Sequence, residues 1–553
     1  MVLNIIPKKY QRYVLAFIVI LTIIFFTTTE TTNLNKFKSQ LQSDSKSNHD
    51  ITYHSTTGSN IITTDSNTGY DWVLDIINKN SPGVKPLIEF KGQYQAKEKF
   101  ASDDDFIFSK EYLSNIVPLD DLTFKRLKQS HIAYLDDILN DKHTSFGNEF
   151  KTPEGEGIVF VGGIKFSWLS LIVIEQLRNT GCKLPIEVFI GTENEYEEEF
   201  CEQILPRYNG RCTYLPGEIG DVSTKIDAKI NGYQYKNLAF LISNFKKILF
   251  LDADNCPLFD PTPLFKSKAF QDNGLVIWPD VWARTTHPKY YEIAGLEIKN
   301  KIIRGPLQSK PLNEDFDFNT QVNFHDLEGT LPNPSSESGM ILVDKVKHVK
   351  TLLLSLYYNI YGPNLYYSLF TQGSAGEGDK ETFIAAATVL NTSYYQVIEM
   401  FKFIGYHFNE KFSSKALGQF DPIQDYKNYQ SGTKIGEDIR LIKSSNYIEP
   451  KVFFMHLSYP KLVPFALLND NEIIKENQQH IRMYRGSTEL AGYDFELQIF
   501  QILTSLLCEN YTGNSPVLEN LLGLKLKEYW GQDPNTFCPS LIEHVKFLES
   551  NPE

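Results

Sequence analysis

The chain has 553 residues and a formal net charge of −14, and no basic stripe stands out, so we expect no nucleic-acid or anionic-lipid partner. Its length is sufficient for one large α/β domain with elaborations, or for two smaller domains.

An uncharged apolar stretch lies near the N-terminus. Residues 13–29 include VLAFIVILTIIFF and have about the minimum length of a membrane-spanning helix. Basic residues within 1–12 precede it and Glu30 follows, so the positive-inside rule keeps 1–12 in the cytosol as a tail. A cleaved signal peptide is the alternative, but its apolar region would be shorter and no small-residue cleavage site follows. We expect an uncleaved type II anchor.

Three segments outside the central pattern are assigned by composition. Residues 30–69 are rich in Thr, Ser and Asn, which predicts a flexible stem whose hydroxyls could carry O-glycans; plain disorder is compatible with this. Residues 70–156 are predicted to be mostly helical and to pack beside the domain that follows. Residues 466–553 are predicted to be a C-terminal helical elaboration.

The six cysteines favour disulfides in a chain with an export anchor. The local pairings that we expect are Cys201 with Cys212 and Cys508 with Cys538. Asn391 and Asn510 begin glycosylation sequons, which matter only in a lumenal compartment.

An α/β pattern begins at residue 157 and predicts an α/β domain over 157–465. Strands at 158–161 and 186–190 flank a helix at 168–178, which is a βαβ unit. Gly162 and Gly163 follow the first strand. They would let the backbone approach a donor nucleotide, although a simple strand-to-helix turn explains them equally well.

The most informative stretch is KKILFLDADNCPLFDPTPLF, residues 246–265. Its apolar run at 248–251 is typical of a strand buried on both faces of a parallel sheet. Asp252 and Asp254 follow at the C-terminal edge, where open α/β sheets bind ligands. Paired carboxylates there suit Mg²⁺ or Mn²⁺, so the stretch predicts a divalent metal that neutralises a diphosphate.

The Asp-x-Asp spacing by itself is also compatible with structures that bind no metal. The same spacing occurs at 103–105 and 315–317 without a preceding apolar strand, and a solvated turn or an Asx-cap can produce it. An EF-hand is excluded because Pro257 and Pro263 stand where that loop requires Gly and Glu. The strand context favours the metal.

Two segments supply further candidate donor contacts. Lys236 lies in a predicted helix at 233–246 and could reach a phosphate, although such a lysine is more often on a solvated face. A strand at 274–278 leads to Asp280. Arg284 follows, and it could pair with a diphosphate or with Asp280.

Aromatic residues cluster after the same strand. They could form a sugar-stacking wall, or equally an aromatic core under a loop. They are Trp278, Trp282, Tyr290 and Tyr291.

A glycine-rich acidic loop lies at 373–379, after a predicted strand at 340–343 and a helix at 347–361. Gly376 and Gly378 would let Glu377 and Asp379 meet an acceptor sugar. Asp379 could instead be the N-cap of the following helix.

His456 follows a last apolar strand at 452–455. A lone histidine is more often structural, but its nitrogen would suit Mn²⁺ better than Mg²⁺. Lys461 could then face a phosphate.

Five segments resemble the fungal Golgi α-mannosyltransferases over roughly residues 157–461: LFLDADN, WPDVWARTTHPKYYEIAG, FHDLEGTLPNPSSESGMILVDK, LLLSLYYNIYGPNLYY and QGSAGEGDKETFIAAA. The pattern is closer to the α-1,2-mannosyltransferases that branch the α-1,6-mannan backbone of N-glycans than to α-1,3 capping enzymes. Asp252 and Asp254 match the family's metal motif. His456 and Lys461 are similar in placement to the third metal ligand and the phosphate-binding lysine of the wider retaining GT-A group.

The resemblance implies a GT-A-like, Rossmann-type domain with a mostly parallel sheet, GDP-mannose as donor and Mn²⁺ as cofactor. It also implies a lumenal domain at the Golgi membrane, a role in protein glycosylation and cell wall mannan synthesis, and other Golgi mannosyltransferases as candidate partners. Retention of the anomeric configuration is compatible with two routes. Either an enzyme carboxylate first forms a covalent intermediate, or the acceptor attacks on the face from which the phosphate leaves. We favour the second route, with Asp379 orienting the acceptor. An α-1,3-mannosyltransferase that caps N- or O-glycans, a glycan-binding protein on the same fold and a metal-dependent hydrolase remain alternatives.

Overall fold

The computed structural model describes residues 68–103, 105–140, 150–163, 165–305, 316–432, 447–508 and 534–553. They belong to one compact unit, Ser66–Glu553. The predicted anchor at 13–29 and the stem up to residue 67 lie outside them. Within these ranges, no helix is long and apolar enough to cross a membrane.

A seven-stranded sheet forms the centre of the unit, in the order β3-β2-β1-β4-β7-β6-β8. β7 runs antiparallel to β4 and β6, and the other neighbouring strands are parallel. The strands are β1 (Glu156–Val161), β2 (Ile186–Ile190), β3 (Gly210–Tyr214), β4 (Lys247–Leu251), β6 (Leu275–Pro279), β7 (Ser336–Asp344) and β8 (Tyr395–Gln396). The prediction of an α/β fold with a mostly parallel central sheet is confirmed.

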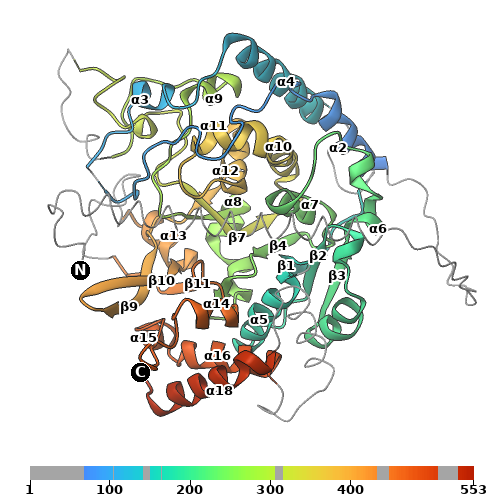
Figure 1. Ribbon diagram of the computed structural model, residues 1–553. Coiled ribbons are helices and arrows are strands. Elements are labelled where there is room, and N and C mark those ends of the chain that lie inside the picture. The colour runs from blue at the N-terminus through green and yellow to red at the C-terminus, as the bar shows by residue number, and fades with distance from the viewer. Residues whose placement is uncertain are drawn as a thin grey trace, which may run out of the picture. The chain divides into compact units, whose positions relative to one another are not determined.

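Helices cover both faces of this sheet (Figure 1). In β4, Ile248 and Phe250 face a core shared with α4, α7, α10 and α12, whereas Leu249 and Leu251 face a core shared with α5, α16 and α18. A strand with two buried faces explains why its sequence is a continuous apolar run.

The helices have the following bounds: α2 (Thr68–Lys79), α3 (Lys110–Ser114), α4 (Asp121–Asn140), α5 (Lys165–Asn179), α6 (Leu215–Ile219), α7 (Tyr235–Ile242), α8 (Lys268–Asn273), α9 (Pro288–Ile293), α10 (Val349–Ile360), α11 (Tyr367–Thr371), α12 (Thr382–Val389), α13 (Pro422–Gln430), α14 (Pro464–Asn469), α15 (Ser487–Ala491), α16 (Phe495–Leu507) and α18 (Pro534–Ser550). The segment predicted to be mostly helical, 70–156, carries α2, α3 and α4, with irregular chain between α2 and α3.

A second, four-stranded sheet was not predicted. Its order is β5-β11-β10-β9, with β5 (Asn255–Pro257), β9 (Lys402–Phe408), β10 (Lys411–Phe420) and β11 (Val452–His456). β5 begins directly after Asp254 and pairs antiparallel with β11, so that His456 lies opposite Asn255. The second sheet therefore carries His456 to the carboxyl end of β4.

Both predicted disulfides, Cys201–Cys212 and Cys508–Cys538, are confirmed. The second joins the end of α16 to α18, and Cys182 and Cys256 are buried thiols. Of the two sequon asparagines, Asn391 is exposed, whereas Asn510 lies outside the described residues.

Candidate active site

Two clefts meet at the carboxyl end of β4. The wide cleft has a volume of about 500 Å³ and the narrow cleft about 390 Å³. Tyr233, Asp252, Asp254 and Lys461 line both of them. The Asp-x-Asp pair thus stands at the junction of two cavities, as a site that joins two substrates requires.

Backbone bonds to both sheets fix the two aspartates. The Asp252 N–H donates to the carbonyl oxygen of Gly339 in β7 at 2.8 Å, and the Asp254 carbonyl accepts the N–H of Leu457, just after β11, at 2.8 Å. Because both neighbours are paired strands, the position of the carboxylates is set by the sheets rather than by a free loop.

Asp254 lies in a row of alternating charges. His456 Nε2 is 3.7 Å from Asp254 Oδ2, His456 Nδ1 is 3.3 Å from Glu337 Oε2, and Lys461 forms an ion pair with Asp254. Burial raises the pKa of Asp254, but His456 and Lys461 outweigh it and hold that pKa well below its usual range. Burial also raises the pKa of Glu337, but the neighbouring His456 outweighs it and lowers that pKa to about 2.

Asp252 belongs to a second charged group around Lys236. The buried Lys236 Nζ lies 3.3 Å from Asp252 Oδ2 and 3.1 Å from Asp379 Oδ2, and donates to the Ser338 carbonyl oxygen at 2.9 Å. Burial raises the pKa of Asp252 to about 6; Lys236 opposes this rise and the neighbouring carboxylate of Asp254 adds to it. Lys236 therefore neutralises the carboxylates of Asp252 and Asp379. It also lines the narrow cleft.

The acidic loop contributes carboxylates to the wide cleft. Asp379 is buried and accepts a hydrogen bond from Ser338 Oγ at 3.2 Å, whereas Glu377 is exposed and accepts one from Thr371 Oγ1 at 2.9 Å. Gly378, not Asp379, occupies the N-cap of the 3₁₀ turn that follows.

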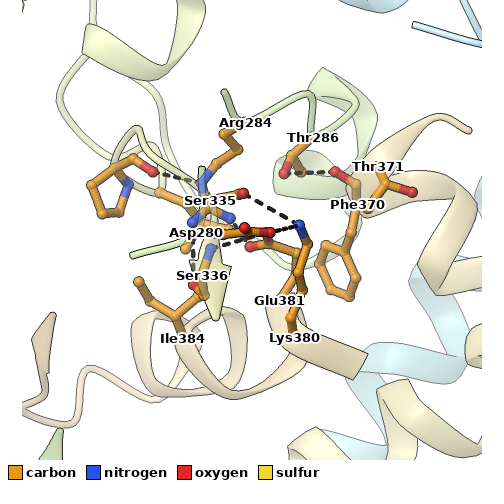
Figure 2. Close-up of polar contacts among 12 residues, drawn as sticks. Asp280, Arg284, Thr286, Ser335, Ser336, Phe370, Thr371, Lys380, Glu381 and Ile384 are labelled. Atoms are coloured by element: carbon orange, nitrogen blue, oxygen red, sulfur yellow. Dashed lines mark hydrogen bonds and ion pairs between the residues drawn. The ribbon is translucent and has the colours of Figure 1, made fainter. Parts of the chain in front are cut away.

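Lys380 and Asp280 form a buried pair at the base of the wide cleft. Lys380 Nζ is 2.5 Å from Asp280 Oδ2 and 3.4 Å from Ser335 Oγ. Figure 2 shows Lys380 pointing toward both of these side chains. Asp280 lines the cleft as an ion-paired carboxylate.

Trp278 was predicted as part of a sugar-stacking wall of the donor site and Arg284 as a contact to its diphosphate, and the structure corrects both. Trp278 is fully buried and its indole N–H donates to the carbonyl oxygen of Phe420 at 2.8 Å. Arg284 is buried in an ion pair with Glu381 (Figure 2). Neither is among the described residues that line either cleft.

One residue of the predicted aromatic wall does reach the wide cleft. Trp282 stacks on Phe100 with ring centroids 5.1 Å apart, and Phe403 packs edge-on against Phe100 at 5.8 Å. All three line the cleft, whereas Tyr290 and Tyr291 are buried in the core. The aromatic shelf, as we call Phe100, Trp282 and Phe403, joins three segments far apart in the sequence.

The predicted glycine turn borders the narrow cleft. Gly162 lines it, and a Cβ there would meet Val188 Cγ1 at 2.4 Å. Gly163 has φ +91° and packs against Glu195, another lining residue. Gly162 is needed because a side chain would collide with Val188, and Gly163 is needed because its positive φ is unfavourable for other residues.

Comparison with known proteins identifies the family. Residues 155–421 match the family described as "Mannosyltransferase putative". The chain is 45% identical over 509 residues to the α-1,2-mannosyltransferase MNN2 of Candida albicans, covering 85% of this chain and 81% of that protein. The α-1,2-mannosyltransferase MNN2 of Saccharomyces cerevisiae is 35% identical, covering 81% and 78% respectively. The chain belongs to the fungal α-1,2-mannosyltransferase family.

A solved structure also matches. The galactosyltransferase LgtC, in complex with donor and acceptor sugar analogs, is 13% identical with a TM-score of 0.31, covering 65% of this chain and 99% of that chain. The assignment to the α-1,2-mannosyltransferase family, and with it the glycosyltransferase activity, rests on the sequence relatives.

Glu337 is a site residue of this mannosyltransferase-family chain that the sequence analysis did not single out. It lines the wide cleft and contacts His456. Parallel strands present their carboxyl ends at the site, but β7 runs antiparallel and presents its first residues there. A strand's direction is not visible in its apolar pattern.

The donor atoms at the junction are of the kinds that a hard or borderline divalent cation binds, carboxylate oxygen and imidazole nitrogen. Within the described ranges, no three His, Cys, Asp or Glu side chains are grouped so as to hold a metal ion. The carboxylate of Asp254 instead contacts the ammonium group of Lys461.

Proposed function

We propose that this chain transfers a mannosyl group from GDP-mannose, with retention, to the 2-hydroxyl of an α-mannoside acceptor such as the α-1,6-mannan backbone of N-glycans. The observation that carries the proposal is the position of Asp252 and Asp254 at the junction of two clefts in a member of this family. We further propose a lumenal catalytic domain on a type II anchor in the Golgi membrane, supported by the apolar segment at 13–29.

In this proposal the narrow cleft takes the nucleotide and the wide cleft takes the acceptor. The narrow cleft is bordered by Gly162, beyond the carboxyl end of β1, where α/β folds bind nucleotides. The wide cleft carries the aromatic shelf and the carboxylates Glu377 and Asp379, groups that suit the apolar faces and hydroxyls of a sugar. The diphosphate then lies at the junction.

Asp252, Asp254 and His456 are the side chains that would hold Mn²⁺, because carboxylate oxygens and an imidazole nitrogen are the kinds of donor that it binds. In the described ranges they are not grouped as a metal site, and Asp254 would have to exchange the ammonium group of Lys461 for the cation. When bound, the cation supplies positive charge to the departing diphosphate. Lys461, which pairs with Asp254 and is half exposed, can turn its ammonium group to a phosphate oxygen once that carboxylate has another partner.

Retention follows most simply if the acceptor attacks from the side on which the phosphate leaves. Lys236 and Ser338 hold Asp379 in place, so it can orient an acceptor hydroxyl without becoming a nucleophile. The departing phosphate then accepts the acceptor's proton, which removes the need for a separate base.

Incubating the full-length chain with GDP-mannose and α-mannobiose tests the proposal. We expect a trisaccharide with a new α-1,2 linkage, its loss on chelation, and its return with added Mn²⁺. Release of free mannose without a trisaccharide would indicate a hydrolase instead. Binding of α-mannobiose without any turnover would indicate a glycan-binding protein.

Trp282→Ala is expected to raise the KM for α-mannobiose about two- to thirteenfold, because it removes stacking worth roughly 0.5–1.5 kcal/mol. The KM for GDP-mannose should not change, since Trp282 lines only the wide cleft among the two clefts described. Trp282→Phe is the matched control, and steady-state kinetics make the measurement. A rise confined to the KM for the donor would show that the two clefts are assigned the wrong way round.

A further inference from the structure

A third cavity, which we call the edge pocket, lies at the outer edge of the central sheet beside β8 and α13. It has a volume of about 320 Å³, at the lower end of the range of about 300–1,000 Å³ for small-ligand sites. None of its described lining residues lines the wide or the narrow cleft. It is therefore a separate place for a ligand.

One wall of the edge pocket is a fixed group of tyrosine rings. Tyr395 and Tyr426 pack edge-on with centroids 4.7 Å apart, and Tyr429 stacks beside Tyr426 at 5.9 Å. The Tyr395 hydroxyl donates to Asp425 at 2.6 Å and the Tyr426 hydroxyl to Asp272 at 2.9 Å. Tyr429 is 49% exposed. Such rings offer an apolar face that needs no rearrangement before binding.

Amide groups line the pocket beside the rings. Gln396 donates through Nε2 to the Ser335 carbonyl oxygen at 3.3 Å, and its buried Oε1 has no hydrogen-bond partner in the described part of the chain. Asn333 accepts the N–H of Arg284 at 2.9 Å through Oδ1, which directs its amide nitrogen elsewhere. A buried acceptor without a partner is rare in folded proteins, and a ligand hydroxyl would satisfy it.

The charge of the lining argues for a neutral ligand. Arg304 is the one charged side chain among the described lining residues. Its guanidinium donates to the carbonyl oxygens of His325, Leu327 and Thr330, at 2.9–3.1 Å. A phosphate or a carboxylate would need a cation that is not already engaged in this way. Aromatic faces, amides and a single cation that is already hydrogen-bonded to the backbone fit a neutral hexopyranose.

One backbone carbonyl lies between the edge pocket and the wide cleft. The carbonyl oxygen of Ser335 accepts a hydrogen bond from Gln396 Nε2, on the side of the edge pocket. It also accepts one, at 2.8 Å, from the N–H of Asp280, which lines the wide cleft. The segment 332–336 thus separates the two cavities. We propose that the edge pocket binds a hexopyranose unit of the acceptor α-mannoside, remote from the hydroxyl that reacts. This rests on the proposed function, and makes acceptor length a determinant of affinity.

The test compares long and short acceptors in the full-length chain. Tyr429→Ala should raise the KM for a linear α-mannoheptaose roughly three- to tenfold, and leave the KM values for α-mannobiose and GDP-mannose unchanged. Tyr429→Phe should behave like the unmodified chain, because it keeps the ring. Phe90→Ala removes another exposed ring, 64% exposed and outside the pocket, and is the matched control. Equal KM values for the heptaose in Tyr429→Ala and in the unmodified chain would overturn the proposal.

A second measurement separates this proposal from the proposed function. If the unmodified chain transfers nothing, the proposed function fails, and direct binding of α-mannoheptaose by saturation-transfer NMR still tests the pocket. Binding that weakens in Tyr429→Ala but not in Phe90→Ala would support the pocket. Two results would refute it: equal binding of α-mannoheptaose by both variants, or displacement of bound α-mannoheptaose from the Tyr429 ring by guanosine.

Discussion

Asp254→Asn is expected to lower the rate of mannosyl transfer roughly 10²–10³-fold or more, the range seen when one preorganised charge-stabilising group is lost from an active site. Asp254 contacts His456 and Lys461 and stands at the junction of both clefts. Asparagine keeps the shape but removes the charge that would hold a cation and position Lys461. The measurement is product formation at saturating GDP-mannose and acceptor.

Loss of the fold is not expected to explain that result. Lys461 is half exposed and can return its charge to water, and His456 keeps its contact with Glu337. Far-ultraviolet circular dichroism and the unfolding temperature should therefore change little. Asp105→Asn is the matched control, because it alters the second aspartate of another Asp-x-Asp pair, one exposed at the surface. Undiminished transfer by Asp254→Asn would refute the assignment of the site.

Apolar runs predicted the central strands well, because a strand buried on both faces has to be apolar throughout. The predicted strand at 186–190 coincides with β2, and the run at 248–251 lies within β4. The carboxyl-end rule then placed Asp252 and Asp254 beside a cavity. These features depend on short-range sequence and on general sheet geometry.

The direction in which a buried side chain points was not predictable in the same way. Trp278 stands in a strand with two buried faces, and the register between β6 and β7 shifts between Ile277 and Trp278. No apolar pattern reports that shift, and because both faces of the strand are buried, the ring lies in the core. Its neighbour Trp282, beyond the strand, reaches the cleft.

The choice of ion-pair partner was also beyond the sequence. Arg284 is four residues from Asp280, which made that pairing the natural alternative to a phosphate. In the structure Arg284 pairs with Glu381 and Asp280 with Lys380, residues 97 and 100 positions away. The 3₁₀ turn Asp379–Glu381 at the end of the acidic loop supplies both partners, and only the tertiary fold brings it there.

Glu381→Ala is expected to lower the free energy of unfolding by about 3–5 kcal/mol, the cost of leaving a buried charge without its partner. The side chains of Arg284 and Glu381 are 0% and 1% exposed. Glu381 also accepts the N–H of Ser336 at 3.2 Å. Because natural domains are stable by only about 5–15 kcal/mol, this loss should be visible in yield and in chemical unfolding.

A double-mutant cycle separates the pair from the rest of the core. Since removing both charges leaves no uncompensated ion, Arg284→Met with Glu381→Leu should cost less than the sum of the two single changes. Glu292→Ala is the control, because it breaks an ion pair at the surface, where the side chains of Lys289 and Glu292 are 43% and 51% exposed. It should lower the free energy of unfolding by at most about 1 kcal/mol. Additive losses in the cycle would mean that Arg284 is stabilised by the carbonyl oxygens of Pro332 and Pro334, to which it also donates, rather than by the charge of Glu381.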